Sequence, residues 1–195
     1  MEKRRIVAFD FDDTLTTKDT LFQFVCYSMG RVATWWGILL YSPLMLAAFL
    51  GLYDRGKAKE RFLAHFFHGM PYKEFKRMGH DFADVVDTFV NTSMLQCLQQ
   101  HQQQGDTVYV ISASIEDWVR PWCERHHVEH VLATQIEVAD GLLTGRFSSP
   151  NCSGNEKVKR FLAVEPQRET YHLTAYGDSN GDSQLLAFAD EGTRI

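Results

Sequence analysis

The sequence predicts an α/β fold, in which helices flank a parallel sheet and a helical module is inserted into the sheet domain. Short runs of β-branched and aromatic residues alternate with segments of helical spacing, which favours a parallel sheet covered on both faces. One long interval, residues 17–91, has helical spacing and no strand-like run. A chain of 195 residues is long enough for one hydrophobic core and a smaller satellite module. We therefore expect a Rossmann-like core with an inserted all-helical cap.

The elements of the core follow from local patterns. The run RIVAFD predicts a buried strand, and Gly105 predicts the end of a helix. Ser114 to Asp117 has the pattern of a capping box, which predicts a helix through about Arg125. Asp140-Gly141 predicts the turn of a hairpin. In chain order we expect strand 5–10, helix 93–104, strand 107–111, helix 114–125, strand 128–134, hairpin 135–146, helix 157–164, strand 170–176 and a further strand from 193.

These elements divide the chain into two parts. Residues 1–16 and 92–195 form the predicted core, and residues 17–91 form the predicted cap, with an uncharged apolar segment over residues 32–53. The apolar spacing of the cap predicts packed helices, because phenylalanine and valine recur at intervals of three and four residues.

Composition excludes several classes of protein. The net charge of −5 and a pI near 5.9 leave no basic surplus for nucleic acid. The four cysteines are scattered and form no CxxC pair, which is typical of reduced thiols in the cytoplasm and unlike a zinc site or a disulfide framework. The basic N-terminus is followed by no long apolar core, so we expect no signal peptide.

Acidic residues follow two of the predicted strands. Asp10 and Asp12 end the first strand two residues apart, and Asp178 and Asp182 follow the strand that ends near Tyr176. The carboxyl ends of parallel strands meet at one edge of a sheet, where ligands bind. Converging carboxylates raise one another's pKa unless a cation lies among them, and Mg²⁺ is the cation that prefers such oxygens. The sequence therefore predicts a magnesium site that receives a phosphoryl group.

The order of these motifs resembles the haloacid-dehalogenase superfamily. DxDxT ends the first strand, a hydrophobic strand ends in Ser112, Lys157 begins a helix, and Gly177-Asp178 precedes a second aspartate. The inserted helical segment resembles the cap, of C1 type, in the phosphoserine-phosphatase-like branch. The resemblance covers nearly the whole chain. It implies a phosphomonoester phosphatase that works through a covalent aspartyl-phosphate.

The resemblance also implies a role for each motif residue. Asp10 would be the nucleophile, and Asp12 would protonate the leaving group and then activate water. The remaining roles are phosphoryl binding by Ser112, Ala113 and Lys157, and Mg²⁺ binding by Asp10, the backbone carbonyl of Asp12, Asp178 and Asp182, with Asp182 adjacent or in the outer shell. Lys159 is an alternative to Lys157 as the lysine that binds the phosphoryl group. Gly181 stands where phosphoserine phosphatases usually have asparagine, which weakens the assignment to phosphoserine itself.

The segment 32–53 is long and apolar enough to pass a test for a membrane span. A span would place Asp10 and Ser112 on opposite sides of the bilayer, so a working site excludes it. Two interpretations remain open. One is a buried pair of cap helices bent at Ser42-Pro43, and the other is a helical hairpin that contacts a membrane or a lipid substrate from the cytoplasmic face. The segment resembles the cap of bacterial phosphatases that act on phosphatidylglycerophosphate.

The substrate is therefore predicted as a phosphatidylglycerophosphate-like lipid, or alternatively as a phosphoserine-like small molecule. Asp19 and Arg61 are the candidates for contacting the substrate beyond its phosphate, because phosphoserine phosphatases have a carboxylate and an arginine near these places. A phosphotransferase and a non-catalytic membrane-associated module are the remaining alternatives. The sequence leaves the oligomeric state open.

Overall fold

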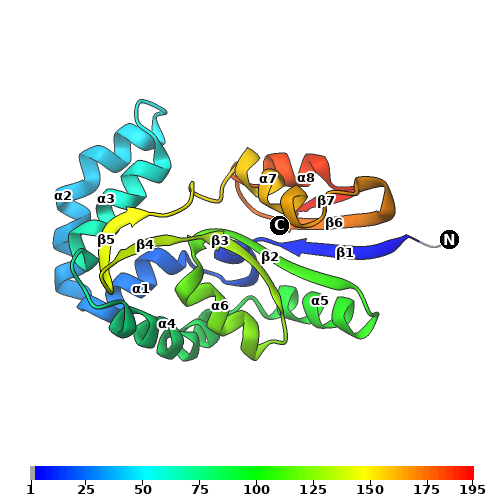
Figure 1. Cartoon of the computed structure of the whole chain (residues 1–195), viewed down its shortest axis with the longest axis horizontal. Helices are drawn as coiled ribbons and strands as arrows, with labels where there is room; N and C mark the ends of the chain where they lie inside the picture. The colour runs from blue at the N-terminus through cyan, green and yellow to red at the C-terminus, as the bar shows by residue number, and fades with distance from the viewer. Residues whose placement is uncertain (1–2) are drawn as a thin grey trace.

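The computed structural model describes residues 3–195, and its centre is a five-stranded sheet in which every neighbouring pair of strands is parallel (Figure 1). The strand order is β3-β2-β1-β6-β7. The strands are β1 (Arg4–Phe9), β2 (Thr107–Ile115), β3 (His130–Thr134), β6 (Tyr171–Gly177) and β7 (Glu191–Arg194). This arrangement confirms the predicted α/β class.

Helices cover both faces of the sheet (Figure 1). The helices α5 (Thr92–Gln103) and α6 (Glu116–Arg125) lie on one face, and α7 (Asn155–Val164) and α8 (Ser183–Phe188) lie on the other. The alternation along β1 explains this layering, because Val7 and Phe9 pack into the core on one side while Ile6 and Ala8 pack into a second core on the other side. A strand segment buried on both faces must be apolar, as β1 is from Ile6 to Phe9 after its two exposed arginines.

The cap consists of α1 (Thr20–Met29), α2 (Arg31–Phe49), α3 (Arg55–Phe67) and α4 (Tyr72–Val86), which lie between β1 and β2. Aromatic side chains join it to the core. Phe24 of α1 stacks on Trp118 of α6 with ring centroids 4.5 Å apart, and Phe75 and Phe82 of α4 contact Phe24 edge-on. Burial of such rings stabilises the fold strongly, so α1 and α4 are anchored on α6.

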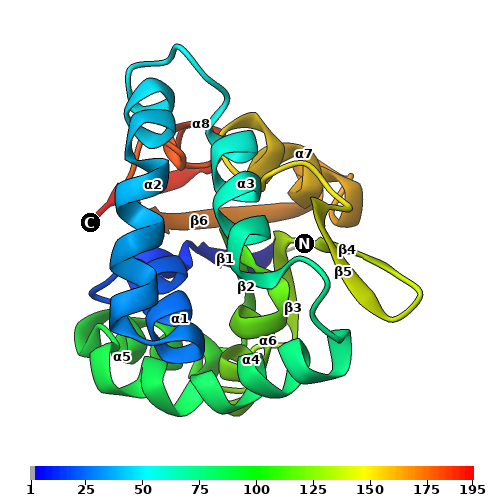
Figure 2. The same ribbon diagram turned by 90° about the vertical axis from the view of Figure 1, so that its left-hand side faces the viewer.

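A hairpin of the second half of the chain also contacts the cap. Its strands are β4 (Ile136–Ala139) and β5 (Leu142–Phe147), turning at Asp140 and Gly141 as predicted. The backbone of Leu143 exchanges hydrogen bonds with Gly69 and Met70 in the connection between α3 and α4. Figure 2 shows α2 and α3 side by side, with the hairpin beside α3.

Two local predictions are wrong. Helix α6 begins at Glu116 after Ile115 and has no side-chain cap, because Ser114 still belongs to β2 and its hydroxyl donates to Asp12 instead.

The predicted break at Ser42-Pro43 is also absent, since α2 continues through Pro43. Proline cannot donate to the carbonyl of Leu39 four residues earlier. The hydroxyl of Ser42 donates to that carbonyl at 2.8 Å, which satisfies it and lets the helix continue.

Helix α2 is mostly exposed, which contradicts the interpretation of the apolar segment as a buried helix pair. Only Thr34, Gly37 and Ala48 are buried along it. It is also the one helix of the described chain that is long and apolar enough to cross a membrane by length and composition. Ile38, Tyr41 and Met45 pack against the core, but many large side chains of α2 are exposed, namely Val32, Trp35, Trp36, Leu39, Leu40, Leu46 and Phe49.

Candidate active site

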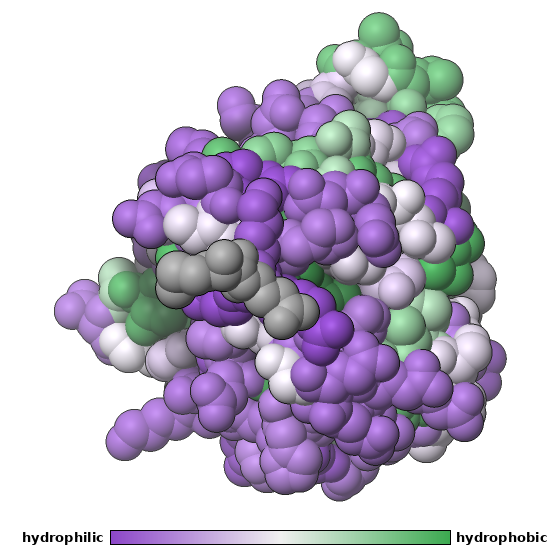
Figure 3. Space-filling view, turned by 90° about the vertical axis from the view of Figure 1, so that its right-hand side faces the viewer, coloured by the Kyte–Doolittle hydropathy of each residue, from purple (hydrophilic) through white to green (hydrophobic). Residues whose placement is uncertain are grey.

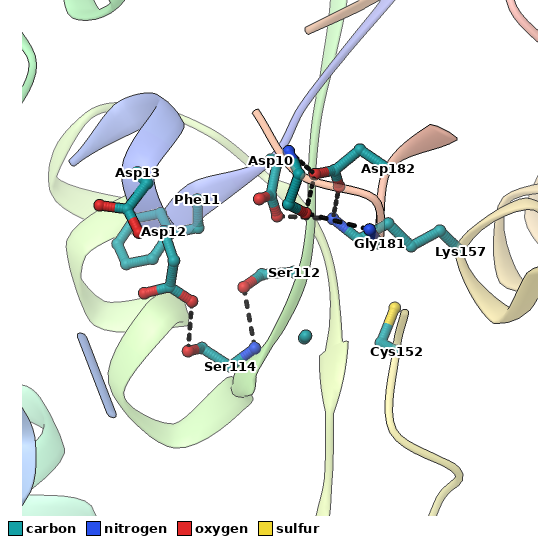
Figure 4. Close-up of polar contacts among 12 residues, drawn as sticks. Asp10, Phe11, Asp12, Asp13, Ser112, Ser114, Cys152, Lys157, Gly181 and Asp182 are labelled. Atoms are coloured by element: carbon teal, nitrogen blue, oxygen red, sulfur yellow. Dashed lines mark hydrogen bonds and ion pairs between the residues drawn. The ribbon is translucent and has the colours of Figure 1, made fainter. Parts of the chain in front are cut away.

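The site lies at the carboxyl end of the central strands, where Asp10 follows β1. Its backbone N–H donates to the carbonyl of Tyr176 on β6 at 2.9 Å, so it is fixed between two strands. Asp178 and Asp182 follow β6, and their carboxylate oxygens and one of Asp10 lie within 4.8 Å of one another. The predicted convergence of Asp10, Asp178 and Asp182 is therefore present (Figure 4 draws Asp10 and Asp182).

Lys157 joins two of these acids. Its ammonium Nζ lies 2.5 Å from an oxygen of Asp10 and 2.5 Å from one of Asp182, and it is 2% exposed (Figure 4). Burial alone would lower the pKa of Lys157, but the two carboxylates hold it above its usual value. Lys159 is exposed and faces Glu156, so Lys157 is the lysine at the site.

The two acids beside Lys157 differ in their electrostatics. Burial raises the pKa of Asp10 to about 7, although Lys157 opposes the shift, and the charges of Asp182 and Asp12 add to it. For Asp182 burial also acts upward, but Lys157 and Ser179 outweigh it and hold the pKa below its usual value. Ser179 donates to Asp182 from both its backbone N–H and its hydroxyl. Asp182 is thus a fixed anion, whereas Asp10 gains most from a further cation.

Burial and the charges of Asp182 and Asp13 raise the pKa of Asp178. Three carboxylates that crowd in this way favour binding a hard divalent cation, which would remove their mutual repulsion. Carboxylate oxygens are the donors that Mg²⁺ prefers, so the residues Asp10, Asp178 and Asp182 fit that ion. The side chain of Asp12 lies outside this cluster, which is compatible with a contribution from its backbone carbonyl only.

Asp12 is held by the cap and by β2 together. One of its oxygens accepts hydrogen bonds from the backbone N–H of Thr20 at 2.7 Å and from the Thr20 hydroxyl at 2.5 Å. The other accepts from the hydroxyl of Ser114 at 2.5 Å (Figure 4). Asp13 has a positive φ of 55°, so the chain turns sharply after Asp12. Neither Thr20 nor this use of Ser114 could be predicted from the sequence, because no motif links either residue to Asp12.

Ser112 and Ala113 lie at the end of β2. The Ser112 hydroxyl is fully buried and accepts a hydrogen bond from the backbone N–H of Ser114 at 2.9 Å. Figure 4 shows it between Asp10 and Ser114, facing the same space. The carbonyl of Ala113 accepts from the hydroxyl of Thr134 and from the ammonium of Lys59, each at 2.8 Å.

The two residues that were predicted to contact the substrate beyond its phosphate, Asp19 and Arg61, have different surroundings. Asp19 caps α1 by accepting from the backbone N–H of Phe22, and burial together with the charge of Asp12 raises its pKa. Arg61 is exposed and its guanidinium stacks over Tyr53 with 5.5 Å to the ring centroid. The cap cation that reaches the site is Lys59, two residues before Arg61 and on another face of α3.

Gly181, the departure from the usual motif, has a packing reason. A Cβ atom there would lie 2.7 Å from the hydroxyl oxygen of Ser153. The Gly181 carbonyl accepts from the backbone N–H of Gly154 at 2.7 Å, which joins the loop of Asp182 to the loop that leads into α7. Glycine allows these two loops to meet beside Lys157.

The chain is similar to several known proteins. The family model described as haloacid dehalogenase-like hydrolase matches residues 7–187. Protein CicA of Caulobacter vibrioides is 29% identical over 97% of this chain and 86% of its own length. A histidinol-phosphatase of Neisseria meningitidis is 26% identical over 58% of this chain and 54% of its own. A substrate-bound phosphoserine phosphatase structure superposes with a TM-score of 0.68 and 16% identity, covering 97% of this chain and 84% of that one.

Proposed function

Because the chain belongs to the haloacid dehalogenase-like hydrolase family, we propose that it is a Mg²⁺-dependent phosphatase that hydrolyses phosphomonoesters through a phosphoryl group carried on Asp10. The observation that supports it best is the convergence of Asp10, Asp178 and Asp182 on one point beside the buried Lys157. The phosphatase names among the relatives and structural neighbours support the same reaction class.

In the proposed reaction a carboxylate oxygen of Asp10 attacks phosphorus, and the bond from phosphorus to the alcohol oxygen breaks. Asp12 donates a proton to that oxygen, so a neutral alcohol leaves. A water molecule then attacks phosphorus, gives its proton to Asp12, and releases phosphate and the Asp10 carboxylate. The hydrogen bonds from Thr20 and Ser114 hold the Asp12 carboxyl in place for both proton transfers.

The charges of the site suit this chemistry. Bound Mg²⁺ would supply positive charge against the phosphoryl oxygens and the three aspartates. Asp182 holds Lys157 toward Asp10, and the proposed role of Lys157 is to bind a phosphoryl oxygen. Ser112, with its hydroxyl facing the same space, and the Ala113 segment complete the proposed phosphoryl site.

Phosphate release from p-nitrophenyl phosphate tests this proposal. We expect activity that requires Mg²⁺, is abolished in Asp10→Asn, and is unchanged in Lys159→Gln, an exposed lysine on the same helix as Lys157. Borohydride reduction during turnover should convert Asp10 to homoserine, detectable by mass spectrometry of the peptide. Wild-type rates in Asp10→Asn, or turnover that EDTA leaves unaffected, would overturn the proposal.

For the substrate we propose a lipid phosphomonoester such as phosphatidylglycerophosphate, taken from a membrane surface that α2 contacts. The support is the apolar face of α2 and of the turn that follows it, where Trp36, Phe49 and Leu52 are 67%, 74% and 79% exposed. Figure 3 shows apolar atoms on the projection that rises above the polar surface there. Such an exposed apolar surface, flanked by Arg31, Arg55 and Lys57, suits an anionic bilayer.

Vesicle co-sedimentation tests the membrane contact. We expect binding to vesicles rich in phosphatidylglycerol, weaker binding to phosphatidylcholine, and loss of binding in Trp36→Glu/Leu40→Glu, with p-nitrophenyl phosphate activity retained because these side chains are exposed. A concentration-dependent dimer that the double variant abolishes, without vesicle binding, would assign the surface to a second copy of the chain.

The alternative substrate is a small phosphoserine-like ester. It is supported by the fold shared with phosphoserine phosphatase and by the two oppositely charged residues Asp19 and Lys59, whose charges act on each other and on Asp12. A phosphate-release screen of phosphatidylglycerophosphate, phosphoserine, histidinol phosphate and phosphocholine separates the two substrate classes. Highest turnover with phosphatidylglycerophosphate in mixed micelles supports the lipid.

A further inference from the structure

Lys59 of α3 is a cation that the cap places inside the site, and no motif predicts it. Its ammonium Nζ donates to the carbonyl of Ala113 at 2.8 Å, immediately after Ser112. An ammonium has three N–H donors, and this is the one hydrogen bond that Lys59 makes through them within residues 3–195. Two donors are therefore available to a ligand.

The ammonium of Lys59 also has no close counter-ion. Within the described part of the chain no carboxylate lies within 4.0 Å of it, whereas Lys157 has both Asp10 and Asp182 at 2.5 Å. The pKa of Lys59 is lowered by burial, and the nearby acids oppose that shift. A half-buried ammonium that has no counter-ion carries a desolvation cost, and an anion bound beside it would offset that cost.

The position of Lys59 indicates which part of a substrate it meets. The carbonyl that Lys59 contacts belongs to Ala113, and the next residue, Ser114, donates its hydroxyl to Asp12 at 2.5 Å. Asp12 is the proposed proton donor to the leaving oxygen, so Lys59 lies on the side of the leaving alcohol. The charge of Lys157 is already balanced by two acids, so among the described residues of the site Lys59 is the cation that is free to bind a second negative group.

We propose that Lys59 binds an anionic group on the leaving alcohol and so selects phosphomonoesters that carry a second negative charge beyond the scissile phosphoryl group. This inference rests on the proposed phosphatase function. A carboxylate or a phosphodiester has the required chemistry, so the selection applies to a soluble ester and to a lipid head group alike. Because Lys59 belongs to α3, the selection requires the cap to be closed over the core, as it is here.

Matched pairs of substrates test the proposal. O-phosphoserine and O-phosphoethanolamine differ only in a carboxylate on the leaving alcohol, and phosphatidylglycerophosphate and phosphatidic acid differ in a phosphodiester there. Each is measured as a substrate or as a competitive inhibitor of p-nitrophenyl phosphate hydrolysis. We expect the wild type to prefer the more anionic member of each pair, and Lys59→Gln to lose about 10- to 100-fold of that preference, the worth of a charge-assisted hydrogen bond.

Three controls separate selection from structural damage. Lys59→Arg should keep much of the preference because it keeps the charge, and Lys73→Gln, an exposed lysine of α4, should keep all of it. The measured quantity is the ratio of the two rates within a pair, so an effect that Lys59→Gln has on both rates alike cancels. Equal losses on both members of a pair, or no preference in the wild type, would overturn the inference. Absence of wild-type activity on p-nitrophenyl phosphate would instead reject the proposed function.

Discussion

At the scale of single residues, the carboxylates of Asp10 and Asp12 differ in the groups that surround them. Asp10 faces the ammonium of Lys157 and the acids of the β6 loop, whereas Asp12 accepts three hydrogen bonds from Thr20 and Ser114. A carboxylate beside cations suits a nucleophile that must stay ionised. A carboxyl group that is held by hydroxyl and amide donors, outside the acidic cluster of Asp10, Asp178 and Asp182, suits repeated proton transfer.

Asp12→Ala tests this division. We expect turnover to fall by about 10²–10⁴-fold, the usual worth of positioned acid–base catalysis, while Mg²⁺ affinity changes little because the side chain lies outside the metal cluster. Isothermal titration with Mg²⁺ and phosphate release from p-nitrophenyl phosphate measure the two effects. Ser114→Ala, which removes one of the three hydrogen bonds, should lose less activity. Equal loss of metal binding in Asp12→Ala would show that its role is structural.

The pKa of Asp10 predicts a pH dependence of metal binding. Burial raises that pKa to about 7, so between pH 3.8 and 7 the folded protein binds more protons at Asp10 than the unfolded chain does. In the absence of metal this makes stability fall as pH rises through that window. Mg²⁺ needs the ionised carboxylate, so we expect its affinity to increase with pH through about 7.

Calorimetric titration at several pH values, with thermal unfolding in EDTA and in Mg²⁺, measures this dependence. The stabilisation by Mg²⁺ should grow from acidic to mildly alkaline pH. Asp10→Asn, which cannot titrate, should bind Mg²⁺ weakly and with a flatter pH profile. A Mg²⁺ affinity that is constant across this range would contradict the pKa shift.

At the scale of elements, α2 shows how one side chain can preserve a helix that a proline should interrupt. Pro43 removes the N–H that would reach the Leu39 carbonyl, and the Ser42 hydroxyl donates to it instead. The prediction of a bend took into account only the backbone N–H donor that proline lacks. The hydroxyl of the preceding residue restores the hydrogen bond.

A double-mutant cycle measures this compensation. Ser42→Ala should lower the free energy of unfolding by about 0.5–1.5 kcal/mol in the presence of Pro43, the worth of one hydrogen bond. In the Pro43→Ala background the backbone N–H returns, so Ser42→Ala should have little effect. Urea unfolding of the four proteins gives the coupling. Equal effects of Ser42→Ala in both backgrounds would show that the hydroxyl does not replace the missing donor.

In helix α7 the orientation of the helix on the sheet decides which of two lysines reaches the site. Lys157 and Phe161 are four residues apart on the face that packs against the sheet, and both are buried. Lys159 lies on the opposite face and is 78% exposed. The apolar Phe161 was available in the sequence as a marker of the buried face, but spacing alone does not say that a lysine on that face will meet two carboxylates.

At the scale of the whole molecule, the cap has an anchored side and a projecting side. Helices α1 and α4 share an aromatic core with α6, whereas α2 and the turn to α3 extend away from the sheet (Figures 1 and 2). Gly79 of α4 marks the closest approach, because a Cβ there would lie 2.3 Å from the carbonyl oxygen of Asp117. The anchored side fixes the distance between cap and core at Asp12.

Gly79→Ala should therefore push α4 away from α6. We expect a loss of about 1–3 kcal/mol in the free energy of unfolding, the usual cost of overpacking, and a drop in turnover because Thr20 and Lys59 move with the cap. Urea unfolding and p-nitrophenyl phosphate hydrolysis measure the two effects. Mg²⁺ affinity, which depends on core strands, should change less. Unchanged stability would show that α4 and α6 can separate without cost.

The sheet, the order of its motifs and the convergence of Asp10, Asp178 and Asp182 could be predicted from the sequence alone. These features depend on local patterns: short continuous apolar runs mark the strands, and the carboxyl ends of parallel strands share one edge. The hairpin at Asp140-Gly141 was predictable for the same reason, since two residues of positive φ define its turn.

Which cap residues reach the site depends on long-range packing that local patterns do not encode. Three features depend on how helices that are far apart in sequence pack on the sheet. Lys59 rather than Arg61 reaches the site, Thr20 and Ser114 surround Asp12, and α2 is exposed. Rotating a helix by one or two residues moves a side chain from the site to solvent, and the packing of large aromatic side chains between cap and core sets that rotation.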